Sequence, residues 1–142
     1  MNLKRLNIIN FGGWAPKRAH PDDAGADCYA RDTAVVGPHE TVCIPLDVGI
    51  ELPKHMVGFI LPRSSTASRG LVAQAVPIDC GYRGVIHAII TNYDSRPQRI
   101  EPGDRIAQLV VLPCWTGKFR MIEPRKSKRT KRGYGAFGST GK

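Results

Sequence analysis

The sequence predicts an all-β protein, a sandwich or barrel of short strands, on three observations. Apolar, β-branched segments recur along the chain, and turn signals separate them. Fifteen glycines and eleven prolines are spread over the 142 residues, which is typical of short strands joined by turns. No segment keeps a long helical period, so we expect any helix to be short. With 42% hydrophobic residues, a chain of this length can form one domain with its own core.

Six segments carry the strand pattern, and each is rich in valine, isoleucine or leucine. Glycine and proline mark the turns between them, as at Gly37-Pro38 and Pro102-Gly103. The predicted strands are residues 3–9, 41–52, 57–61, 72–78, 85–93 and 105–112.

The last stretch, residues 124–142, differs in composition from residues 1–123. Six cations stand between Arg125 and Arg132, and four glycines follow. The formal net charge of the chain is +9 and falls to +3, nine minus six, without these cations. We expect residues 1–123 to form the β domain and residues 124–142 to form a mobile arm. The cations also predict weak, non-specific contact with nucleic acid or another polyanion through residues 126–132.

Several features indicate the interior of a cell. No segment approaches the roughly 20 apolar residues that span a bilayer, and the N-terminus lacks the apolar core of a secretion signal. The four cysteines are spaced by 15, 37 and 34 residues, which matches neither a zinc site nor a redox pair. We expect reduced thiols, no membrane association and a cytoplasmic location, or the interior of a host cell if the gene is viral or from a phage.

Five polar or glycine-rich patches interrupt the strands, at residues 24–30, 62–67, 78–84, 103–109 and 132–141. In the second patch, Arg63 offers a forked cation, and the following Ser64, Ser65 and Thr66 offer hydroxyl and N–H donors. Donors packed this closely suit a phosphate group. The same residues would also serve as the start of a helix, and the pattern alone does not separate the two interpretations.

Three polar residues in the other patches each have a functional and an ordinary interpretation. Asp79 stands between two apolar strands, and it would act as a general base on water or simply shape a turn. Asp27 would orient a metal-bound water or an arginine, or stand as a solvated carboxylate at a strand end. Gln108 is either buried and paired or directed at a ligand.

The fifth patch has a composition suited to a lid. Its glycines allow the backbone to approach a ligand closely, and Phe137 has no core to join unless it stacks on a partner such as a base. Arg132, Ser139 and Thr140 add groups that bind phosphate. The alternative is a disordered tail with an incidental phenylalanine, which the segment alone does not exclude.

Together and in this order, the five patches resemble the trimeric deoxyuridine triphosphatases (dUTPases) over residues 24–141. The most specific parts are Asp79-x-x-Tyr82-Arg83-Gly84 and the fifth patch. The resemblance implies a distorted jelly-roll β-barrel, assembled as a homotrimer with three active sites at subunit boundaries. It also implies Mg²⁺-dependent hydrolysis of dUTP to dUMP and pyrophosphate, which limits uracil incorporation into DNA, and an arm that closes over the site of another subunit.

The resemblance gives individual positions a role. Asp79 matches the carboxylate that activates the attacking water, Tyr82 packs on the deoxyribose, and Arg83 completes this catalytic loop. Phe137 matches the aromatic side chain that stacks on the base, and Asp27 the carboxylate that orders waters of Mg²⁺. The resemblance implies three groups of substrate contacts: for the phosphates Arg63, Ser64, Ser65 and Gln108, for uracil Val76, Pro77, Ile78 and His87, and from the arm Arg132, Phe137, Gly138, Ser139 and Thr140.

The sequence departs from the family pattern at Ser65, at Val76-Pro77 and at Ala136, and two other functions are open. A nucleic-acid-binding protein would use the basic run, although no known DNA-binding pattern accompanies it. A dCTP deaminase resembles the family in fold and lid but needs a catalytic glutamate. None of the glutamates falls in one of the five patches: Glu40, Glu51, Glu101 and Glu123.

Overall fold

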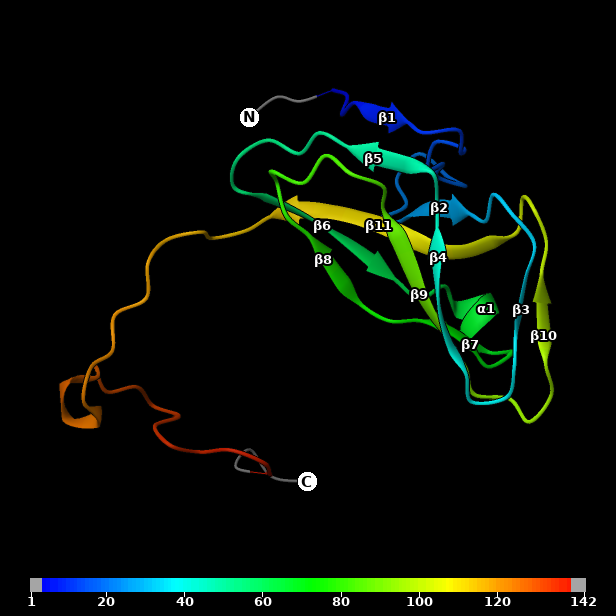
Figure 1. Cartoon of the computed structure of the whole chain (residues 1–142). Helices are drawn as coiled ribbons and strands as arrows, with labels where there is room; N and C mark the ends of the chain where they lie inside the picture. Colours follow the sequence, from blue (N-terminus) through cyan, green and yellow to red (C-terminus); the bar gives the residue numbers. More distant parts are fainter. Residues whose placement is uncertain (1–3, 139–142) are drawn as a thin grey trace.

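The computed structural model describes residues 4–138 and is built almost entirely of β-strands (Figure 1). In this part of the chain, eleven strands are accompanied by one short helix, α1 (Ser64–Ala67), and one 3-10 turn, η1 (Pro124–Lys126). The predicted all-β class is therefore confirmed. None of the helices described is long and apolar enough to cross a membrane. The strands are β1 (Ile8–Asn10), β2 (Ala26–Tyr29), β3 (Ala34–Val36), β4 (Thr41–Pro45), β5 (Val48–Ile50), β6 (Met56–Leu61), β7 (Leu71–Ala73), β8 (Val76–Ile78), β9 (His87–Asn92), β10 (Gln98–Ile100) and β11 (Arg105–Pro113).

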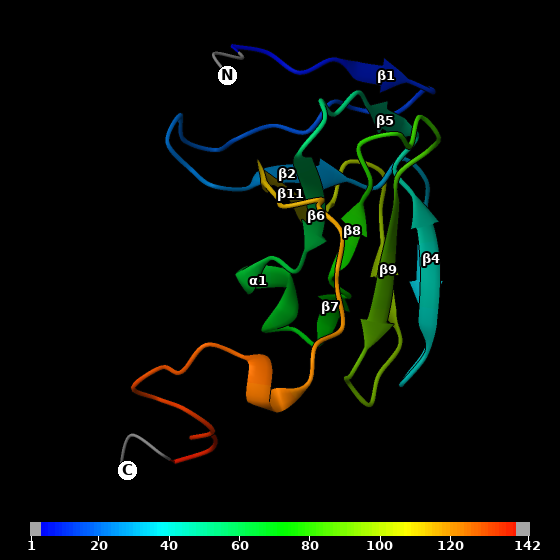
Figure 2. The ribbon, with the colours of Figure 1, turned by 90° about the vertical axis from the view of Figure 1, so that its left-hand side faces the viewer.

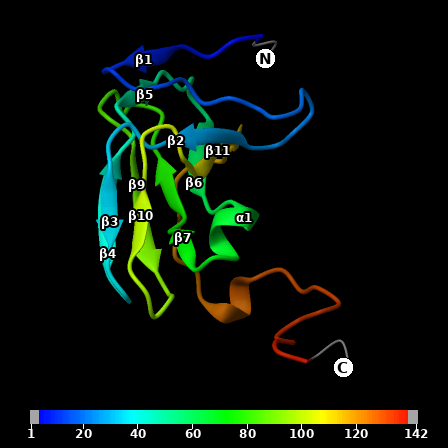
Figure 3. The same ribbon diagram turned by 90° about the vertical axis from the view of Figure 1, so that its right-hand side faces the viewer.

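These strands form antiparallel sheets. The two larger sheets have the orders β2-β11-β6-β8 and β4-β9-β7, and the pairs β1-β5 and β3-β10 complete the body. Figures 2 and 3 show the two larger sheets as separate layers. Their buried side chains belong to one apolar cluster, which includes Ile60 and Leu109 from the first sheet and Leu71 and Ile90 from the second. The core therefore lies between these two sheets.

Strand β9 shows how side-chain alternation builds this core. Ala88, Ile90 and Asn92 are fully buried on one face of the strand, whereas His87 on the other face is exposed. The buried amide of Asn92 is satisfied because its Nδ2 donates to the carbonyl oxygens of Val36 at 3.0 Å and Arg96 at 2.8 Å. The polar residue thus fastens β9 to the neighbouring β3 and to the turn that follows.

Two of the predicted strands are each divided in the structure. Residues 41–52 form β4 and β5, because Asp47 between them has a positive φ of 53°, which ends one strand and redirects the chain. Residues 72–78 form β7 and β8, which pair with β9 and β6 in different sheets. The sequence predicted no strand at β2, β3 or β10, which are three or four residues long and pair with distant segments.

Residues 114–138 lead away from the body, and η1 is their one regular element (Figure 1). His55 contacts the start of this segment, since its carbonyl oxygen accepts the N–H of Cys114 at 2.9 Å and its Nδ1 lies 2.8 Å from the Thr116 hydroxyl. Farther along, the side chain of Phe137 is fully exposed. The domain boundary expected after residue 123 falls at the first residue of η1, ten residues beyond the end of β11.

The buried thiol of Cys28 makes the stability of the core dependent on pH. Its side chain is buried in β2, and this burial, together with the charge of the neighbouring Asp27, raises the pKa of the thiol to about 12. The ordinary pKa of a cysteine thiol, which applies to the unfolded chain, is 9.0. Because the folded state keeps the proton to higher pH, we expect the free energy of unfolding to fall as pH rises from about 9 to 12. This group contributes at most about 1.4 kcal/mol per pH unit to that loss.

Denaturant titrations of the wild type and of Cys28→Ala, at about pH 8 and about pH 10.5, measure this contribution. The alkaline loss of stability should be smaller in the variant, because alanine has no proton to lose. An equal loss in both proteins would show that Cys28 contributes nothing to it.

Candidate active site

A polar pocket of about 430 Å³ opens where β2, α1 and β11 meet. It brings together residues from three of the patches, because Asp27 on β2 is the register partner of Gln108 on β11, and Arg63 directly precedes α1. Three of its polar residues had no role assigned from the sequence: His20, Asp23 and Arg105. The full lining is Ala19, His20, Asp23, Ala24, Gly25, Asp27, Arg63, Ser64, Ser65, Arg105 and Gln108.

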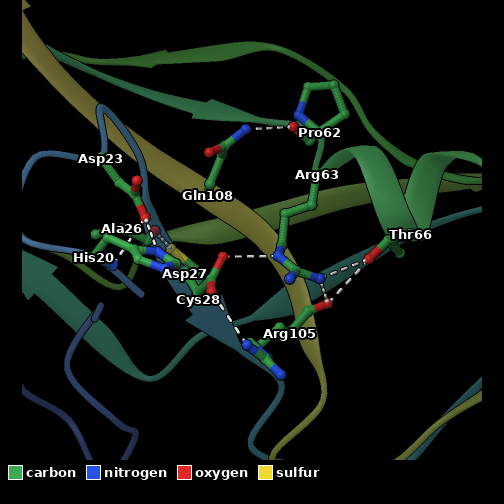
Figure 4. Close-up of polar contacts among 10 residues, drawn as sticks. All are labelled: His20, Asp23, Ala26, Asp27, Cys28, Pro62, Arg63, Thr66, Arg105 and Gln108. Carbon is green, nitrogen blue, oxygen red and sulfur yellow. Dashed lines mark hydrogen bonds and ion pairs between the residues drawn. The ribbon is translucent and has the colours of Figure 1, made fainter. Parts of the chain in front are cut away.

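Arg63 holds the floor of this pocket together (Figure 4). Its Nε donates to Asp27 Oδ1 at 2.7 Å, and its Nη1 donates to the Thr66 hydroxyl at 3.1 Å and to the Arg105 carbonyl at 3.0 Å. The Thr66 hydroxyl donates in turn to the same Arg105 carbonyl at 3.1 Å. One guanidinium group thereby connects β2, α1 and β11. Its Nη2 makes no hydrogen bond to any other residue of the described chain.

Asp27 lies between two guanidinium groups. One is that of Arg63, and the other belongs to Arg105, whose Nη1 is 3.6 Å from Asp27 Oδ2. The Asp27 and Arg63 side chains are only 15% and 18% exposed, so their pairing takes place largely away from solvent. Removing one partner of a buried ion pair leaves an uncompensated charge, which typically costs about 3–5 kcal/mol. This pair therefore fixes the shape of the pocket.

Two serines stand at the mouth of the pocket in the first turn of α1. The residue that precedes the helix is Arg63, and it makes no side-chain capping bond, so neither serine acts as the N-cap. The first helical hydrogen bond runs from the Ala67 N–H to the Arg63 carbonyl at 2.8 Å. The N–H groups of Ser64 and Ser65 precede it and have no partner within the helix. Ser64 and Ser65 therefore offer both exposed hydroxyls and backbone donors.

Gln108 reaches into the pocket from β11, and its orientation is fixed on both sides. Its Nε2 donates to the Pro62 carbonyl at 2.8 Å, which leaves Oε1 facing Gly25. A Cβ atom at position 25 would overlap Oε1, so glycine is required for this close approach. The amide is thus partly paired with the protein and partly available at the pocket.

An apolar pocket of about 270 Å³ lies between β8, β9 and the loop that connects them. Asp79 stands at its rim with an exposed side chain, and His87 borders it from the start of β9. Pro77 is tolerated in β8 because this strand is the edge of its sheet and pairs on one side only, with β6. The lining consists of Ile60, Val76, Pro77, Ile78, Asp79, Tyr82, Val85, Ile86, His87 and Ile89.

The loop at Asp79 is closed by its own side chains. The Tyr82 N–H donates to the Asp79 carbonyl at 3.1 Å, and the Tyr82 hydroxyl donates to the Val85 carbonyl at 2.7 Å. Arg83 lines neither pocket, because its Nη1 donates to the Cys80 carbonyl at 2.6 Å. These bonds hold Asp79 and the Tyr82 ring beside the apolar pocket without help from distant residues.

The two pockets of one chain are separate and share no lining residue. In the four-stranded sheet, Asp27 and Gln108 are register partners and share a face with Leu61, whereas Ile60 and its partner Val76 point to the opposite face. The described part of the arm contributes to neither pocket: Arg132 is exposed and donates from Nε to the Gly135 carbonyl at 2.9 Å, and Phe137 and Gly138 are exposed as well. Ser139 and Thr140 lie outside the described residues.

A third hollow, of about 640 Å³, is larger than either pocket but contains none of the predicted site residues. It lies beside Arg69 and Arg96. The size of a hollow therefore does not identify the site. The polar and apolar pockets are the candidates because residues of the sequence patches cluster in them.

Comparison with known proteins shows the family. The sequence model of the dUTPase family matches residues 13–141. The chain belongs to the dUTPase family. It is 41% identical to the deoxyuridine 5'-triphosphate nucleotidohydrolase of Tropheryma whipplei (strain Twist), over 96% of this chain and 95% of the relative. It is 42% identical to that of Cutibacterium acnes, over 89% and 84%.

Solved dUTPase structures share the fold. The dUTPase of Staphylococcus bacteriophage 80alpha, bound to dUpNHpp, has a TM-score of 0.90 and 30% identity, and the match covers 98% of this chain and 99% of that one. A variant of the dUTPase from phage phi11 of S. aureus, whose structure details the coordination of a structural Mg(II) ion, has a TM-score of 0.78 and 28% identity over 84% and 97%. The expected jelly-roll fold is thus confirmed.

Gly25→Ala tests the fit between Gly25 and Gln108. We expect the added methyl group to displace the Gln108 amide from Pro62, because it would overlap Oε1. Loss of that hydrogen bond lowers the free energy of unfolding by about 0.5–1.5 kcal/mol, which urea titration measures. Gly37→Ala is the matched control, since a methyl group there meets Glu40 at an ordinary 3.5 Å.

A double-mutant cycle shows whether the loss of stability in Gly25→Ala comes from the contact with Gln108. If Gly25→Ala acts through Gln108, most of its cost should disappear in a Gln108→Ala background, where the overlapping amide is absent. A full, additive cost in that background would contradict the contact as the source of the strain.

Proposed function

We propose that the polar pocket, the apolar pocket and the arm are the three parts of one dUTP-hydrolysing site, and that different subunits contribute them. The chain is a dUTP diphosphatase of the dUTPase family, which converts dUTP to dUMP and pyrophosphate. The observation that supports the division of the site is that the two pockets share no lining residue and take strand side chains from opposite faces of the four-stranded sheet. A single nucleotide bound on one face of the sheet would not place its base in one pocket and its phosphates in the other pocket of the same chain.

The polar pocket has the chemistry of a triphosphate site. Ser64 and Ser65 provide hydroxyl and N–H donors, Gln108 an amide, and Arg63 a guanidinium whose Nη2 has no bond within the described chain. Arg105 adds a second cation at the rim. Hydrogen bonds to charged phosphate oxygens contribute about 1.5–3 kcal/mol each. Several of them together would bind and orient the phosphates.

The apolar pocket suits uracil and deoxyribose. Its walls come from Val76, Pro77 and Ile78 on β8 and from His87 and Ile89 on β9, so a flat base would be enclosed by apolar side chains and backbone. A narrow slot of this kind excludes the 5-methyl group of thymine by sterics. Tyr82 stands at the same pocket, where its ring would pack on deoxyribose and leave no room for a 2′-hydroxyl.

Asp79 is the group that we assign as general base. Its carboxylate is exposed at the rim of the apolar pocket, next to where the sugar and the α-phosphate would emerge. It would take a proton from water as the water oxygen bonds to the α-phosphorus. The bond from this phosphorus to the bridging oxygen breaks, and pyrophosphate leaves with the electron pair. Arg83 holds the Asp79 loop in shape through its bond to Cys80.

The residues of the polar pocket fit Mg²⁺ that is carried mainly by the substrate. Among residues 4–138, no three His, Cys, Asp or Glu side chains form a metal-binding group. Both oxygens of Asp27 already face guanidinium groups, so contact through water suits it better than direct ligation. Mg²⁺ typically keeps several waters and binds phosphate oxygens, and when bound it would neutralise their charge. Arg63 and Asp27 would orient that assembly.

The arm would complete the site of another subunit in a homotrimer. In its own chain it leads away from the body, and Phe137 is fully exposed. Over a neighbouring site, Phe137 would stack on the base, while Arg132, Gly138, Ser139 and Thr140 would contact the γ-phosphate. We place this reaction in the cytoplasm, or inside the host cell if the gene is viral or from a phage, where it limits uracil incorporation into DNA.

Asp79→Asn tests the assigned base. With dUTP and Mg²⁺, we expect kcat to fall by about 10²–10⁴-fold, because asparagine cannot accept the proton of the attacking water. Asp32→Asn, an exposed carboxylate outside both pockets, is the matched control and should keep full activity.

Release of pyrophosphate is followed with dUTP, dTTP, dCTP and UTP, and only dUTP should be converted. Ammonia release from dCTP would instead indicate deamination, and an active Asp79→Asn protein would exclude Asp79 as the base.

Subunit mixing tests the divided site. Asp79→Asn inactivates the apolar pocket, and the double variant Ser64→Ala, Gln108→Ala removes phosphate contacts from the polar pocket. Each protein alone should be nearly inactive. When equal amounts are co-refolded into mixed trimers, about a quarter of the sites should receive both intact pockets from different chains. Recovery of about that fraction of wild-type activity is expected, whereas no recovery would mean that each site is built from one chain.

A further inference from the structure

We propose that the basic run of the arm, residues 125–132, binds nucleic acid through its phosphate backbone, and that its cations Lys126, Lys128, Arg129 and Lys131 have no part in dUTP hydrolysis. Almost all of the net charge of the protein lies in the part of the chain that follows β11. Residues 1–113 contain twelve Lys and Arg against eleven Asp and Glu, whereas residues 114–142 contain nine against one. The body is therefore close to neutral and the segment after it carries +8 of the total of +9.

The cations of this run are exposed and mostly free of partners. Arg125 donates to Glu123 at 2.8 Å, and Arg132 to the Gly135 carbonyl at 2.9 Å. The other four, Lys126, Lys128, Arg129 and Lys131, form no ion pair with any described residue, and all are exposed. They also lie outside both pockets. Neither the fold nor the proposed active site uses these four charges.

The run has a three-residue repeat in which two cations are followed by a hydroxyl. The hydroxyl positions are Ser127 and Thr130. Ser127, the residue that follows η1, has φ −70° and ψ 138°, close to polyproline II. A bound run in that conformation would have three residues per turn, so each position of the repeat would keep its own face. Two faces would be cationic and the third would carry hydroxyl donors, and both kinds of group bind phosphate oxygens.

The composition favours a nucleic acid over other polyanionic partners. Residues 125–132 contain no apolar side chain, whereas protein interfaces depend on buried aromatic or aliphatic anchors. Cations alone attract a segment to anionic lipid, but stable attachment to a membrane surface also needs apolar groups or a lipid chain. The exposed Phe119 and Met121 alternate with Lys118 and Arg120 before η1, and no apolar residue stands within residues 125–132. A regular row of phosphates is the surface that a purely polar cationic segment matches.

Salt dependence gives this proposal a quantitative test. If six cations each replace a counterion, the slope of log K against log salt for duplex DNA is about −5, which corresponds to a loss of about 10³-fold in affinity between about 50 and 200 mM salt. Fluorescence anisotropy of a labelled duplex of mixed sequence measures it on the full-length protein. Single-stranded DNA and RNA of the same sequence are titrated in parallel to distinguish the form of nucleic acid preferred.

The decisive variant carries Lys126→Gln, Lys128→Gln, Arg129→Gln and Lys131→Gln. With two cations left, we expect a slope of about −2 and only about a 10-fold loss over the same salt range. The matched control removes four exposed cations from the body instead, Lys4→Gln, Lys17→Gln, Lys54→Gln and Arg96→Gln, and should bind DNA as the wild type does. Both variants should hydrolyse dUTP at the wild-type rate, so a failure of the binding proposal is distinguishable from a failure of the active-site assignment.

Three results would overturn the proposal. The first is the absence of binding to any of the nucleic acids at about 50 mM salt. The second is an arm variant whose slope equals that of the wild type, or a body variant that loses binding equally. The third is binding to vesicles of anionic lipid without binding to nucleic acid, which would indicate a membrane surface as the partner.

Discussion

The ion pair between Arg63 and Asp27 is the contact on which the polar pocket depends. It joins β2 to the turn before α1, and through Nη1 it reaches Thr66 and the carbonyl of Arg105 on β11. Because α1 is only four residues long, it has little intrinsic stability, and this guanidinium fixes where it begins. The positions of Ser64 and Ser65 follow from that anchor. The largely buried guanidinium of Arg63 therefore has a structural role in addition to any role in binding a ligand.

The fold class could be predicted from the sequence, whereas the limits of individual strands could not. The recurrence of apolar segments and turns identified most of the body, and residues 57–61 and 105–112 correspond closely to β6 and β11. Residues 41–52 read as one strand because the apolar pattern continues through Asp47, and only its positive φ divides them. β2 was read as a polar patch because its four residues include Asp27, and its strand character comes from pairing with β11. Short strands are stabilised by distant partners that local sequence does not contain.

The candidate site shows the same limit at the level of side chains. The patches identified Asp27, Arg63, Gln108 and Asp79 as separate candidate site residues, because their polar side chains interrupt the apolar strand segments. The sequence could not show that Asp27 and Arg63 pair with each other, nor that Arg105 joins them, because these contacts span 36 and 42 positions. The placement of the two pockets on opposite faces of the sheet also follows from the strand register, which no local pattern records.

The arm differs from the body in how strongly substitutions lower the free energy of unfolding. On β9 or β11 a new charge would enter the core and lower the free energy of unfolding by several kcal/mol, so selection holds those positions. Residues after Thr116 lie outside that core, and exchanges there change stability little. The amino-acid composition of the arm can therefore change during evolution while the fold and the pockets of the barrel stay the same. A dense row of cations is a change that evolution could try in this segment at almost no cost to folding, and could then retain if a partner made it useful.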